Sequence, residues 1–192
     1  MKKFFQHSLA GSAVLFAFSA SQAAPAINNG DFETGDFTGW TLTGDTDFNV
    51  VTSDAPHTGT YGALFGQQGN AASIVQSIAT ETGHSYAISF WLGNLGGSIN
   101  NPATVSDFAV LANNASLLQL SDKSATDYTQ YTVSFTASSS SSALAFSLRQ
   151  DETYWLLDDV TITDTTSPVP EPSAYLMLGM GLGLLALQRR RQ

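Results

Sequence analysis

The chain has 192 residues, carries a formal net charge of −9 at pH 7 and contains no cysteine. Five of its seven basic residues lie close to the two ends, so residues 24–167 hold only Lys123 and Arg149 against fifteen acids, a net charge of −13. Such an acidic domain repels nucleic acid. A chain without cysteine forms neither disulfides nor thiolate metal sites.

Residues 1–23 have the three zones of a secretory signal peptide. Lys2 and Lys3 form a basic start, Leu9–Phe18 is apolar, and Ser21-Gln22-Ala23 is a small-x-small cleavage site. We therefore expect an exported protein whose mature chain begins at Ala24 or Pro25. Residues 24–167 are then long enough for one domain.

An acidic, glycine-rich segment opens the mature chain. Residues 28–40 hold three acids, Asp31, Glu33 and Asp36, together with three glycines. Turns of this kind can bring carboxylates and carbonyls to one point, as Ca²⁺ requires with its six to eight oxygen ligands. The spacing is not that of an EF-hand, because the glutamate of the twelfth loop position is missing.

The rest of the domain predicts an all-β fold. Short segments rich in β-branched and aromatic residues alternate with Gly, Asn, Asp and Ser, and no interior stretch has a helical apolar period. The spacing of about ten residues is typical of a β-sandwich or jelly roll. The serine run 138–142 is predicted as a turn. The expected strands are Trp40–Thr43, Asn49–Thr52, Tyr61–Phe65, Ala72–Ala79, Ser85–Gly93, Ser106–Asn113, Ser116–Leu120, Gln130–Ala137, Ala143–Arg149 and Trp155–Thr163.

The last predicted strand carries an acid among apolar residues. Period-2 alternation groups Asp158 with Leu156, Val160 and Ile162, which predicts that its carboxylate points into the core. A buried carboxylate needs a partner, and a domain with two basic residues offers few. A bound Ca²⁺ would supply the missing charge.

Four stretches together resemble the galactose-binding-like jelly roll of carbohydrate-binding modules. They are the acidic opening, Pro56–Leu64, the run from Gln76 to Leu92, and Leu157-Asp158-Asp159-Val160. In that family a structural Ca²⁺ often joins the first strand to the last through a glutamate and an aspartate. The resemblance carries this metal site over to Glu33 and Asp158, whereas Asp31 and Asp159 match less well.

A carbohydrate ligand would need exposed aromatic rings, because the C–H faces of sugars stack on them. We single out Trp91, which alternation places on the less apolar face of its strand, and Tyr154 and Trp155, which follow a polar loop. Further candidates are Tyr128 and Tyr131, with Asn94 and Gln150 as polar companions. For each aromatic residue the alternative is packing in the core.

Catalysis finds little support in the sequence. The two histidines of the domain, His57 and His84, sit in turn-like contexts, and no nucleophile elbow, zinc-protease helix or phosphate loop is present. We expect a non-catalytic protein, with a polysaccharide-modifying enzyme as a remote alternative. Another alternative is a structural matrix protein, whose acidic surface is linked to anionic polysaccharide by divalent cations.

The last 24 residues have three zones in a fixed order. Val169-Pro170-Glu171-Pro172-Ser173 is followed by the uncharged stretch 174–187 and by Arg189, Arg190 and Arg191. As a helix, the apolar stretch would span about 21 Å, which is short for a hydrocarbon core of about 30 Å. The arginines predict a cytoplasmic C-terminus. An ordinary single-pass anchor is the alternative interpretation.

This order resembles the PEP-CTERM sorting signal of Gram-negative bacteria, and the domain resembles the jelly rolls that PEP-CTERM proteins carry. The resemblance implies that exosortase, a membrane-embedded cysteine peptidase, recognises the Pro-Glu-Pro motif and removes the tail. The protein would be anchored transiently in the inner membrane and then pass to the cell surface or to a biofilm exopolysaccharide matrix.

Overall fold

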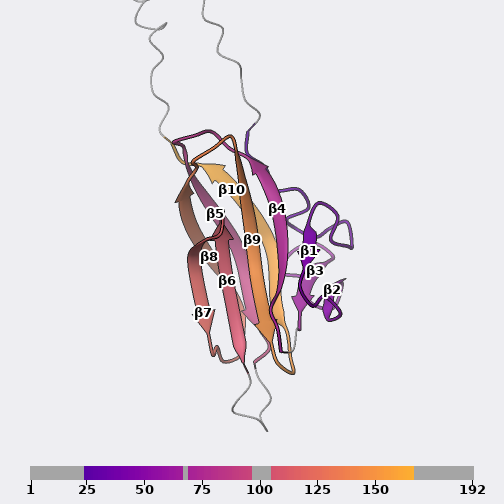
Figure 1. Cartoon of the computed structure of the whole chain (residues 1–192). Helices are drawn as coiled ribbons and strands as arrows, with labels where there is room; N and C mark the ends of the chain where they lie inside the picture. Colours follow the sequence, from indigo (N-terminus) through magenta and orange to yellow (C-terminus); the bar gives the residue numbers. More distant parts are fainter. Residues whose placement is uncertain (1–23, 67–68, 97–104, 167–192) are drawn as a thin grey trace, which may run out of the picture.

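A computed structural model of the chain describes residues 24–66, 69–96 and 105–166 (Figure 1). These ranges contain strands and turns but no helix, and therefore no helix that could cross a membrane. The predicted signal peptide, the sorting motif at 169–173, the apolar stretch 174–187 and the three arginines lie outside the described residues.

Ten antiparallel strands form two five-stranded sheets, which confirms the predicted all-β sandwich. Sheet A has the strand order β1-β4-β9-β6-β7, and sheet B has the order β2-β3-β10-β5-β8. The strands are β1 (Thr41–Thr43), β2 (Asn49–Thr52), β3 (Gly62–Phe65), β4 (Ala72–Ala79), β5 (Ser85–Asn94), β6 (Ser106–Ala112), β7 (Ala115–Ser121), β8 (Thr126–Thr136), β9 (Ser141–Gln150) and β10 (Trp155–Asp164).

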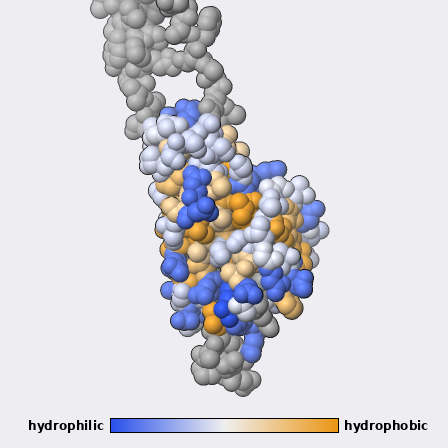
Figure 2. Space-filling view, viewed as in Figure 1, coloured by the Kyte–Doolittle hydropathy of each residue, from blue (hydrophilic) through white to orange (hydrophobic). Residues whose placement is uncertain are grey.

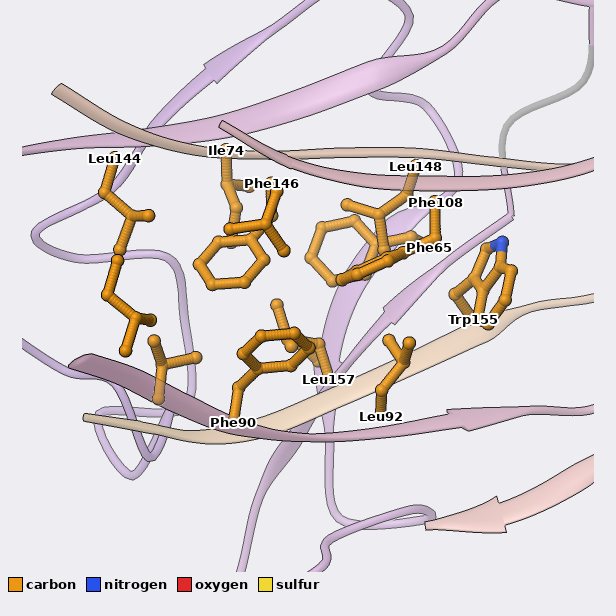
Figure 3. Close-up of a cluster of buried hydrophobic side chains, with 14 of the residues drawn as sticks. Phe65, Ile74, Phe90, Leu92, Phe108, Leu144, Phe146, Leu148, Trp155 and Leu157 are labelled. Atoms are coloured by element: carbon orange, nitrogen blue, oxygen red, sulfur yellow. The ribbon is translucent and has the colours of Figure 1, made fainter. Parts of the chain in front are cut away.

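Alternating side chains from the two sheets meet in one aromatic core. In Figure 3, Phe90 and Leu92 reach from β5 toward Phe108 and Phe146 of the opposite sheet. The ring centroids of Phe90 and Phe146 lie 5.2 Å apart, in an edge-to-face arrangement. Each fully buried side chain of this size stabilises the fold by about 1.5–3 kcal/mol. Packing without disulfides is therefore sufficient to hold the domain together.

The inward orientation predicted for Asp158 is wrong. Leu157 pairs with the core residue Leu92, and Asp158 pairs with Trp91, so the Asp158 side chain lies on the outer face of sheet B. The register shifts between Asp158 and Thr161, and Asp159 has a φ of 50°. This bulge moves the alternation by one position, and Val160 returns to the core.

Two strands begin two or more residues earlier than predicted, whereas all other strand ends agree with the prediction to within one residue. Strand β8 begins at Thr126, because residues 126–129 pair with the end of β5 despite their polar sequence. An edge strand tolerates such residues, since one of its sides faces solvent. Strand β9 begins at Ser141, inside the serine run, where Ser141 pairs with Ala79.

The first and last described residues lie at the same end of the sandwich (Figure 1). Ala24 and Asp164 line one small pocket at this end. The opposite end carries the start of β10 and the end of β5, where Trp155 pairs with Asn94. Because β10 has ten residues, the two ends are about 30 Å apart.

Candidate functional site

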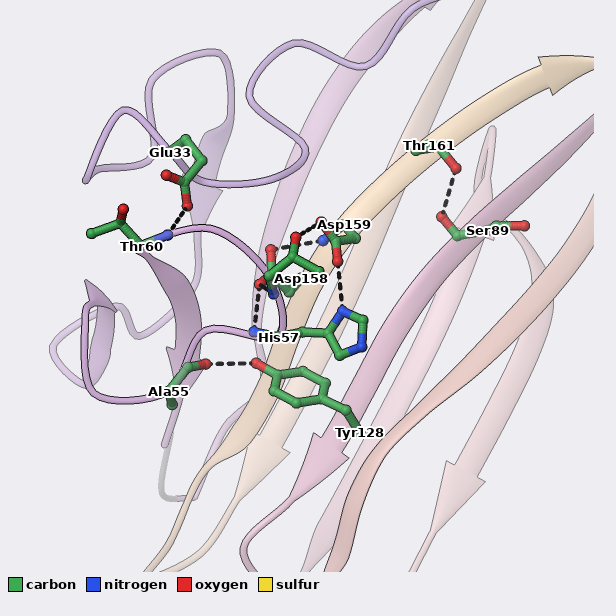
Figure 4. Close-up of polar contacts among 10 residues, drawn as sticks. Glu33, Ala55, His57, Thr60, Ser89, Tyr128, Asp158, Asp159 and Thr161 are labelled. Carbon is green, nitrogen blue, oxygen red and sulfur yellow. Dashed lines mark hydrogen bonds and ion pairs between the residues drawn. The ribbon is translucent and has the colours of Figure 1, made fainter.

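The loop 53–61, between β2 and β3, folds over the outer face of sheet B and is held there by Asp158. One carboxylate oxygen of Asp158 accepts hydrogen bonds from the backbone N–H groups of His57, at 2.8 Å, and Thr58, at 3.4 Å (Figure 4). The other oxygen accepts the N–H of Asp159 at 2.7 Å. Backbone amides of the loop and the bulge are therefore the partners of this carboxylate.

The loop covers Asp158 completely, since the residue is 0% exposed. Burial raises the pKa of Asp158 to about 6, although the N–H groups of His57 and Asp159 act in the opposite direction. At neutral pH the group is mainly ionised, and charge-assisted hydrogen bonds of this kind are stronger than neutral ones. Asp158 thus holds the middle of the loop, at His57 and Thr58.

The fixed loop places His57 against two aromatic rings. The His57 ring stacks on Trp91 with centroids 3.9 Å apart and an interplanar angle of 19°, and it meets the edge of Tyr128 at 5.2 Å. Nδ1 of His57 lies 2.6 Å from a carboxylate oxygen of Asp159, which orients the imidazole. We call His57, Trp91 and Tyr128 the aromatic cluster.

Hydrogen bonds to the bulge and to the loop hold the aromatic cluster in place. Thr58 donates its hydroxyl to Asp159 at 2.7 Å, and Tyr128 donates its hydroxyl to the carbonyl of Ala55 at 2.8 Å. Burial raises the pKa of Tyr128 above its usual value, so its hydroxyl stays protonated and donates. Trp91 remains partly exposed to solvent. The site therefore presents a preorganised indole ring.

An open groove of about 540 Å³ adjoins the aromatic cluster and shares Tyr128 with it. A Cβ at Gly93 would lie 3.1 Å from Cδ1 of Leu156, which lines the groove. The groove combines apolar walls with one carboxylate, and Leu95 on its rim is 54% exposed. Its lining residues are Asn94, Leu95, Ala125, Thr126, Asp127, Tyr128 and Leu156.

The three aromatic residues proposed from the sequence have different environments. Trp91 lies on the outer face of sheet B, as alternation predicted. Trp155 is only 1% exposed, packs on Phe108 with centroids 5.6 Å apart, and donates its indole N–H to the carbonyl of Arg149. The proposal of Trp155 as a sugar-contacting residue is therefore wrong, because its ring belongs to the core.

Tyr154 is partly exposed but packs on a different part of the molecule from Trp91. A Cβ at Gly66 would lie 2.6 Å from Cε1 of Tyr154, so the tyrosine covers this glycine. Its carbonyl accepts the N–H of Leu95 at 3.0 Å. Tyr131 also faces away from the site and stacks on Phe90 with centroids 5.8 Å apart.

The two polar companions, Asn94 and Gln150, are buried and serve the fold. The side-chain amide of Asn94 donates to Ser106 at 2.9 Å and to Gln150 at 3.2 Å. Gln150 in turn donates to the carbonyl of Gly96 at 3.1 Å, and the hydroxyl of Thr153 donates to the same carbonyl. This network closes the end of the sandwich and leaves neither amide to contact a ligand.

The residues proposed for calcium, Glu33 and Asp158, contact the same loop at different points. One carboxylate oxygen of Glu33 accepts the N–H groups of Thr60, at 2.7 Å, and Tyr61, at 2.9 Å, whereas Asp158 binds the loop at His57 and Thr58. The N–H groups of Tyr61 and Thr60 lower the pKa of Glu33. Across the described ranges no three His, Asp or Glu side chains gather as a metal site. Calcium therefore remains a prediction.

The role of His57 was not predicted from the sequence. Its partners Trp91, Tyr128 and Asp159 are distant in the sequence, and only the fold of loop 53–61 brings them together. The available signal was the turn-forming Pro56-His57-Thr58-Gly59 segment, in which Gly59 has a φ of 66°.

Comparison with protein families gives two matches. The family described as a carbohydrate binding domain matches residues 24–153, and the PEP-CTERM protein-sorting motif matches residues 168–192. None of the curated proteins matches the chain.

Several solved structures share the fold. The chain is 18% identical to TmCBM61 in complex with β-1,4-galactotriose, covering 71% of this chain and 95% of that one, with a TM-score of 0.54. The chain is 17% identical to the CBM22-1–CBM22-2 tandem domain of Xyn10C from Paenibacillus barcinonensis. That match covers 81% of this chain and 50% of the tandem domain, with a TM-score of 0.56. The chain is 21% identical to the K3 cleaved adhesin domain of Lys-gingipain from Porphyromonas gingivalis. That match covers 71% of this chain and 96% of the adhesin domain, with a TM-score of 0.54.

Proposed function

The chain belongs to the carbohydrate binding domain family and carries a PEP-CTERM protein-sorting motif, and we propose that it binds a neutral glycan at the surface or in the exopolysaccharide of a Gram-negative bacterium. Both resemblances seen in the sequence are thereby confirmed. The sorting motif indicates an exported protein with a C-terminal membrane-anchoring signal. In this proposal, exosortase removes the anchor, and the released domain contacts carbohydrate without modifying it.

The observation that carries the binding proposal is the aromatic cluster beside the groove. His57 covers part of Trp91 and holds the indole in place, while the rest of the ring stays partly exposed. A rigid aromatic ring loses little conformational entropy when a sugar stacks on it, which favours binding. Thr126 and Asp127 in the adjoining groove supply groups that can hydrogen-bond sugar hydroxyls.

Charge favours a neutral glycan over an acidic one. The domain has two basic residues, and Arg149 is already paired with Asp151 at 2.8 Å. Apart from His57, the charged side chains at the site are acids, namely Asp127 in the groove and Asp159, which lies against Nδ1 of His57. Carboxylates accept hydrogen bonds from hydroxyl groups but repel uronate or sulfate groups.

A non-catalytic role also agrees with the surroundings of His84, whose two ring nitrogens both face acids. Asp159 holds His57 at Nδ1, while Asp164 and Glu81 lie against the two nitrogens of His84. These contacts orient both imidazole rings. At His84, Glu81 lies against Nε2, the nitrogen that faces the nucleophile in a catalytic triad.

Calorimetric titration of residues 24–166 tests the binding proposal. The ligands are the organism's own exopolysaccharide and a set of neutral oligosaccharides, each at low and at moderate salt. We expect saturable binding that persists at moderate salt and is lost in Trp91→Ala. Leu111→Ala, on the outer face of sheet A, is the matched control and should bind normally. Equal binding by both variants would contradict this assignment of the site.

A structural matrix protein is the second candidate, and the net charge of −13 favours it. In that case divalent cations would link the acidic surface to an anionic polysaccharide. The same titration separates the two functions, because heat that does not saturate and vanishes with salt supports the matrix role.

Processing of the tail needs its own test. A chain with Pro170→Ala and Glu171→Ala should stay uncleaved in the inner membrane, as membrane fractionation would show. Normal release of this double variant would contradict the sorting part of the proposal.

A further inference from the structure

The outer face of sheet B carries a row of apolar positions beside the loop 53–61. Strand pairing aligns Val50 of β2 with Leu64 of β3, and Leu64 with Leu156 of β10. Leu156 is in turn aligned with Gly93 of β5. In each strand an adjoining residue belongs to the core or packs against it, so these four positions face outward. We call this row the apolar floor.

Two walls border the apolar floor. On one side, a Cβ at Gly62 would lie 2.5 Å from the carbonyl oxygen of Ala55, so the loop lies directly on the sheet two residues before Leu64. On the other side, the ring of Tyr154 covers Gly66, two residues after Leu64. The positions of Gly62 and Gly66 along β3 are about 13 Å apart. The apolar floor is therefore the bottom of a trough between the loop and Tyr154.

Three exposed hydrophobic side chains lie on or beside this trough. Val50, at one end of the floor, is 44% exposed, and Phe48, two residues before it, is 46% exposed. Leu95, two residues after Gly93, is 54% exposed. No other large hydrophobic side chain in the described part of the chain is exposed to this degree. Exposed apolar side chains that gather in one place indicate a binding surface, whereas scattered ones do not.

The shape of the trough fits a ligand segment better than a second folded chain. Leu156 is only 7% exposed, and the groove of about 540 Å³ that it lines lies within the range of about 300–1,000 Å³ found for small-molecule sites. A broad protein surface would rest on the loop and on Tyr154 without reaching Leu156. The trough is also continuous with Trp91, which lies two residues before Gly93 on the same face. A glycan that stacks on Trp91 and runs toward Tyr154 therefore crosses the floor.

The apolar floor disfavours free hydroxyl groups. Its side chains offer neither donors nor acceptors, so a sugar hydroxyl placed on it would lose its hydrogen bonds to water without a replacement. An O-acetyl group in the same place removes the hydroxyl donor, lays a methyl group on Leu64 or Leu156, and leaves its carbonyl free to face solvent. Hydroxyls that are not acetylated can turn to Thr126 and Asp127 in the groove.

We propose that the site prefers a neutral glycan carrying O-acetyl groups, which pack on the apolar floor while a sugar ring stacks on Trp91. This inference rests on the glycan-binding part of the proposed function and names the ligand class of that site. In this arrangement Trp91 contributes affinity for the sugar ring, and the floor contributes specificity for the acetyl groups. The domain thus distinguishes an acetylated polymer from its unmodified form.

Isothermal titration of residues 24–166 with three forms of the organism's exopolysaccharide tests the proposal. The forms are the native polymer, the polymer after mild alkali, which hydrolyses acetyl esters, and the alkali-treated polymer after partial re-acetylation with acetic anhydride. We expect alkali to weaken the affinity at least tenfold and re-acetylation to restore it, because only the acetylated forms cover the floor. Equal affinity for the native and the alkali-treated polymer would overturn the proposal.

Variants of the floor supply the second arm. The double variant Val50→Thr and Leu64→Thr places hydroxyl groups on the floor, and the tenfold preference for the acetylated form should fall to about twofold. Val75→Thr makes the same change on the outer face of sheet A and should keep both the affinity and the preference. Trp91→Ala should weaken the binding of both forms. An unchanged preference in the double variant would overturn the proposal.

Thermal unfolding shows whether each variant is still folded. Val50→Thr alone replaces a residue that is 44% exposed with one of nearly the same shape, so it keeps the proposal testable if the double variant unfolds. We expect it to lower the preference for the acetylated form about twofold. A preference equal to that of the wild type in this single variant would count against the floor.

Two further outcomes separate this inference from its premise. If neither the native nor the re-acetylated polymer binds, the glycan-binding function itself fails, whereas equal binding of all three forms overturns only the acetyl preference. Sedimentation of the domain without ligand covers the remaining occupant. A dimer that is lost in the floor variants would make a second copy of the chain the partner of the floor and overturn the proposal.

Discussion

The outer faces of the two sheets differ, although both arise from the same alternation of side chains. Sheet A turns toward the viewer in Figures 1 and 2, and Figure 2 shows pale and orange residues across much of its face. Its outward positions hold mostly small side chains, among them Ser73, Val75, Ser77, Ala109, Ala143, Ala145 and Ser147. Sheet B instead carries the aromatic cluster beneath a folded loop. The outer face of sheet B is therefore distinguished by the loop residue His57 together with Trp91 of β5 and Tyr128 of β8.

The loop stays on sheet B because the bulge in β10 turns a carboxylate toward it. Without the register shift, the side chains of Asp158 and Val160 would lie on the same face of sheet B. Either Asp158 would then point into the core or Val160 would point outward. Sheet A also has an irregularity, between Val110 and Leu111, but no buried acid accompanies it. A bulge with a buried acid beside it thus distinguishes the outer face of sheet B from that of sheet A.

Removing the loop anchor should have the largest effect. Asp158→Ala leaves the N–H groups of His57, Thr58 and Asp159 without their acceptor, and we expect a loss of about 3 kcal/mol in the free energy of unfolding. Asp107→Ala, on the outer face of sheet A, should change it by less than about 0.5 kcal/mol. Urea unfolding of both variants measures the difference. Similar losses would show that Asp158 has no special role.

If Glu33 and Asp158 bind calcium, as the family resemblance implies, the cation should stabilise the loop over sheet B and leave sheet A unaffected. A ligand at one hundred times its Kd stabilises the folded state by about 2.7 kcal/mol, so EDTA should lower the Tm of the wild-type domain measurably. Glu33→Ala should have the same Tm in calcium and in EDTA. A calcium-dependent shift that survives this substitution would place the cation elsewhere.

Loss of the exposed indole should affect binding more than stability. We expect Trp91→Ala to weaken the affinity for a neutral glycan at least tenfold, or about 1.4 kcal/mol, because stacking on the ring is lost. Gly93→Ala should weaken binding less, since its methyl group narrows the groove beside Leu156. Isothermal titration gives both values, and the reverse order would place the sugar in the groove instead of on Trp91.

The smallest expected effect concerns pH and lies away from the loop. The hydrogen bond between His84 and Asp164 raises the pKa of His84 and lowers that of Asp164. The histidine stabilises the fold below its unfolded pKa of about 6.5, and this contribution is lost as pH rises through the folded value. The aspartate stabilises it above about 3.9, and this contribution is lost as pH falls through the lowered folded value.

The His84–Asp164 pair should therefore stabilise the domain most between about pH 4 and 6.5. His84→Asn should reduce the difference in Tm between pH 5.5 and 8.5. Binding at Trp91 should be unchanged in this variant, because His84 and Asp164 lie at the end of the sandwich where β5 begins and β10 ends. An unchanged pH dependence of Tm would show that the pair contributes nothing.

The sequence predicted regular strands well and irregular ones poorly. In β5, strict alternation correctly placed Phe90 inside and Trp91 outside. The same rule failed for Asp158, because a bulge shifts the register in β10 between Asp158 and Thr161. Trp155 was proposed because it follows a polar loop, and that context did not reveal its burial. His57 could not be found at all, since its role depends on contacts with residues far along the chain.

Because His57 stacks closely on Trp91, the fluorescence of Trp91 should respond to the position of the loop 53–61. An imidazole ring in contact with an indole quenches its fluorescence, and these two ring centroids are 3.9 Å apart. The other two tryptophans, Trp40 and Trp155, are buried in the core, so we expect them to emit at shorter wavelengths than Trp91. Lifting of the loop would therefore appear as brighter, red-shifted emission from Trp91, well before the core emission changes.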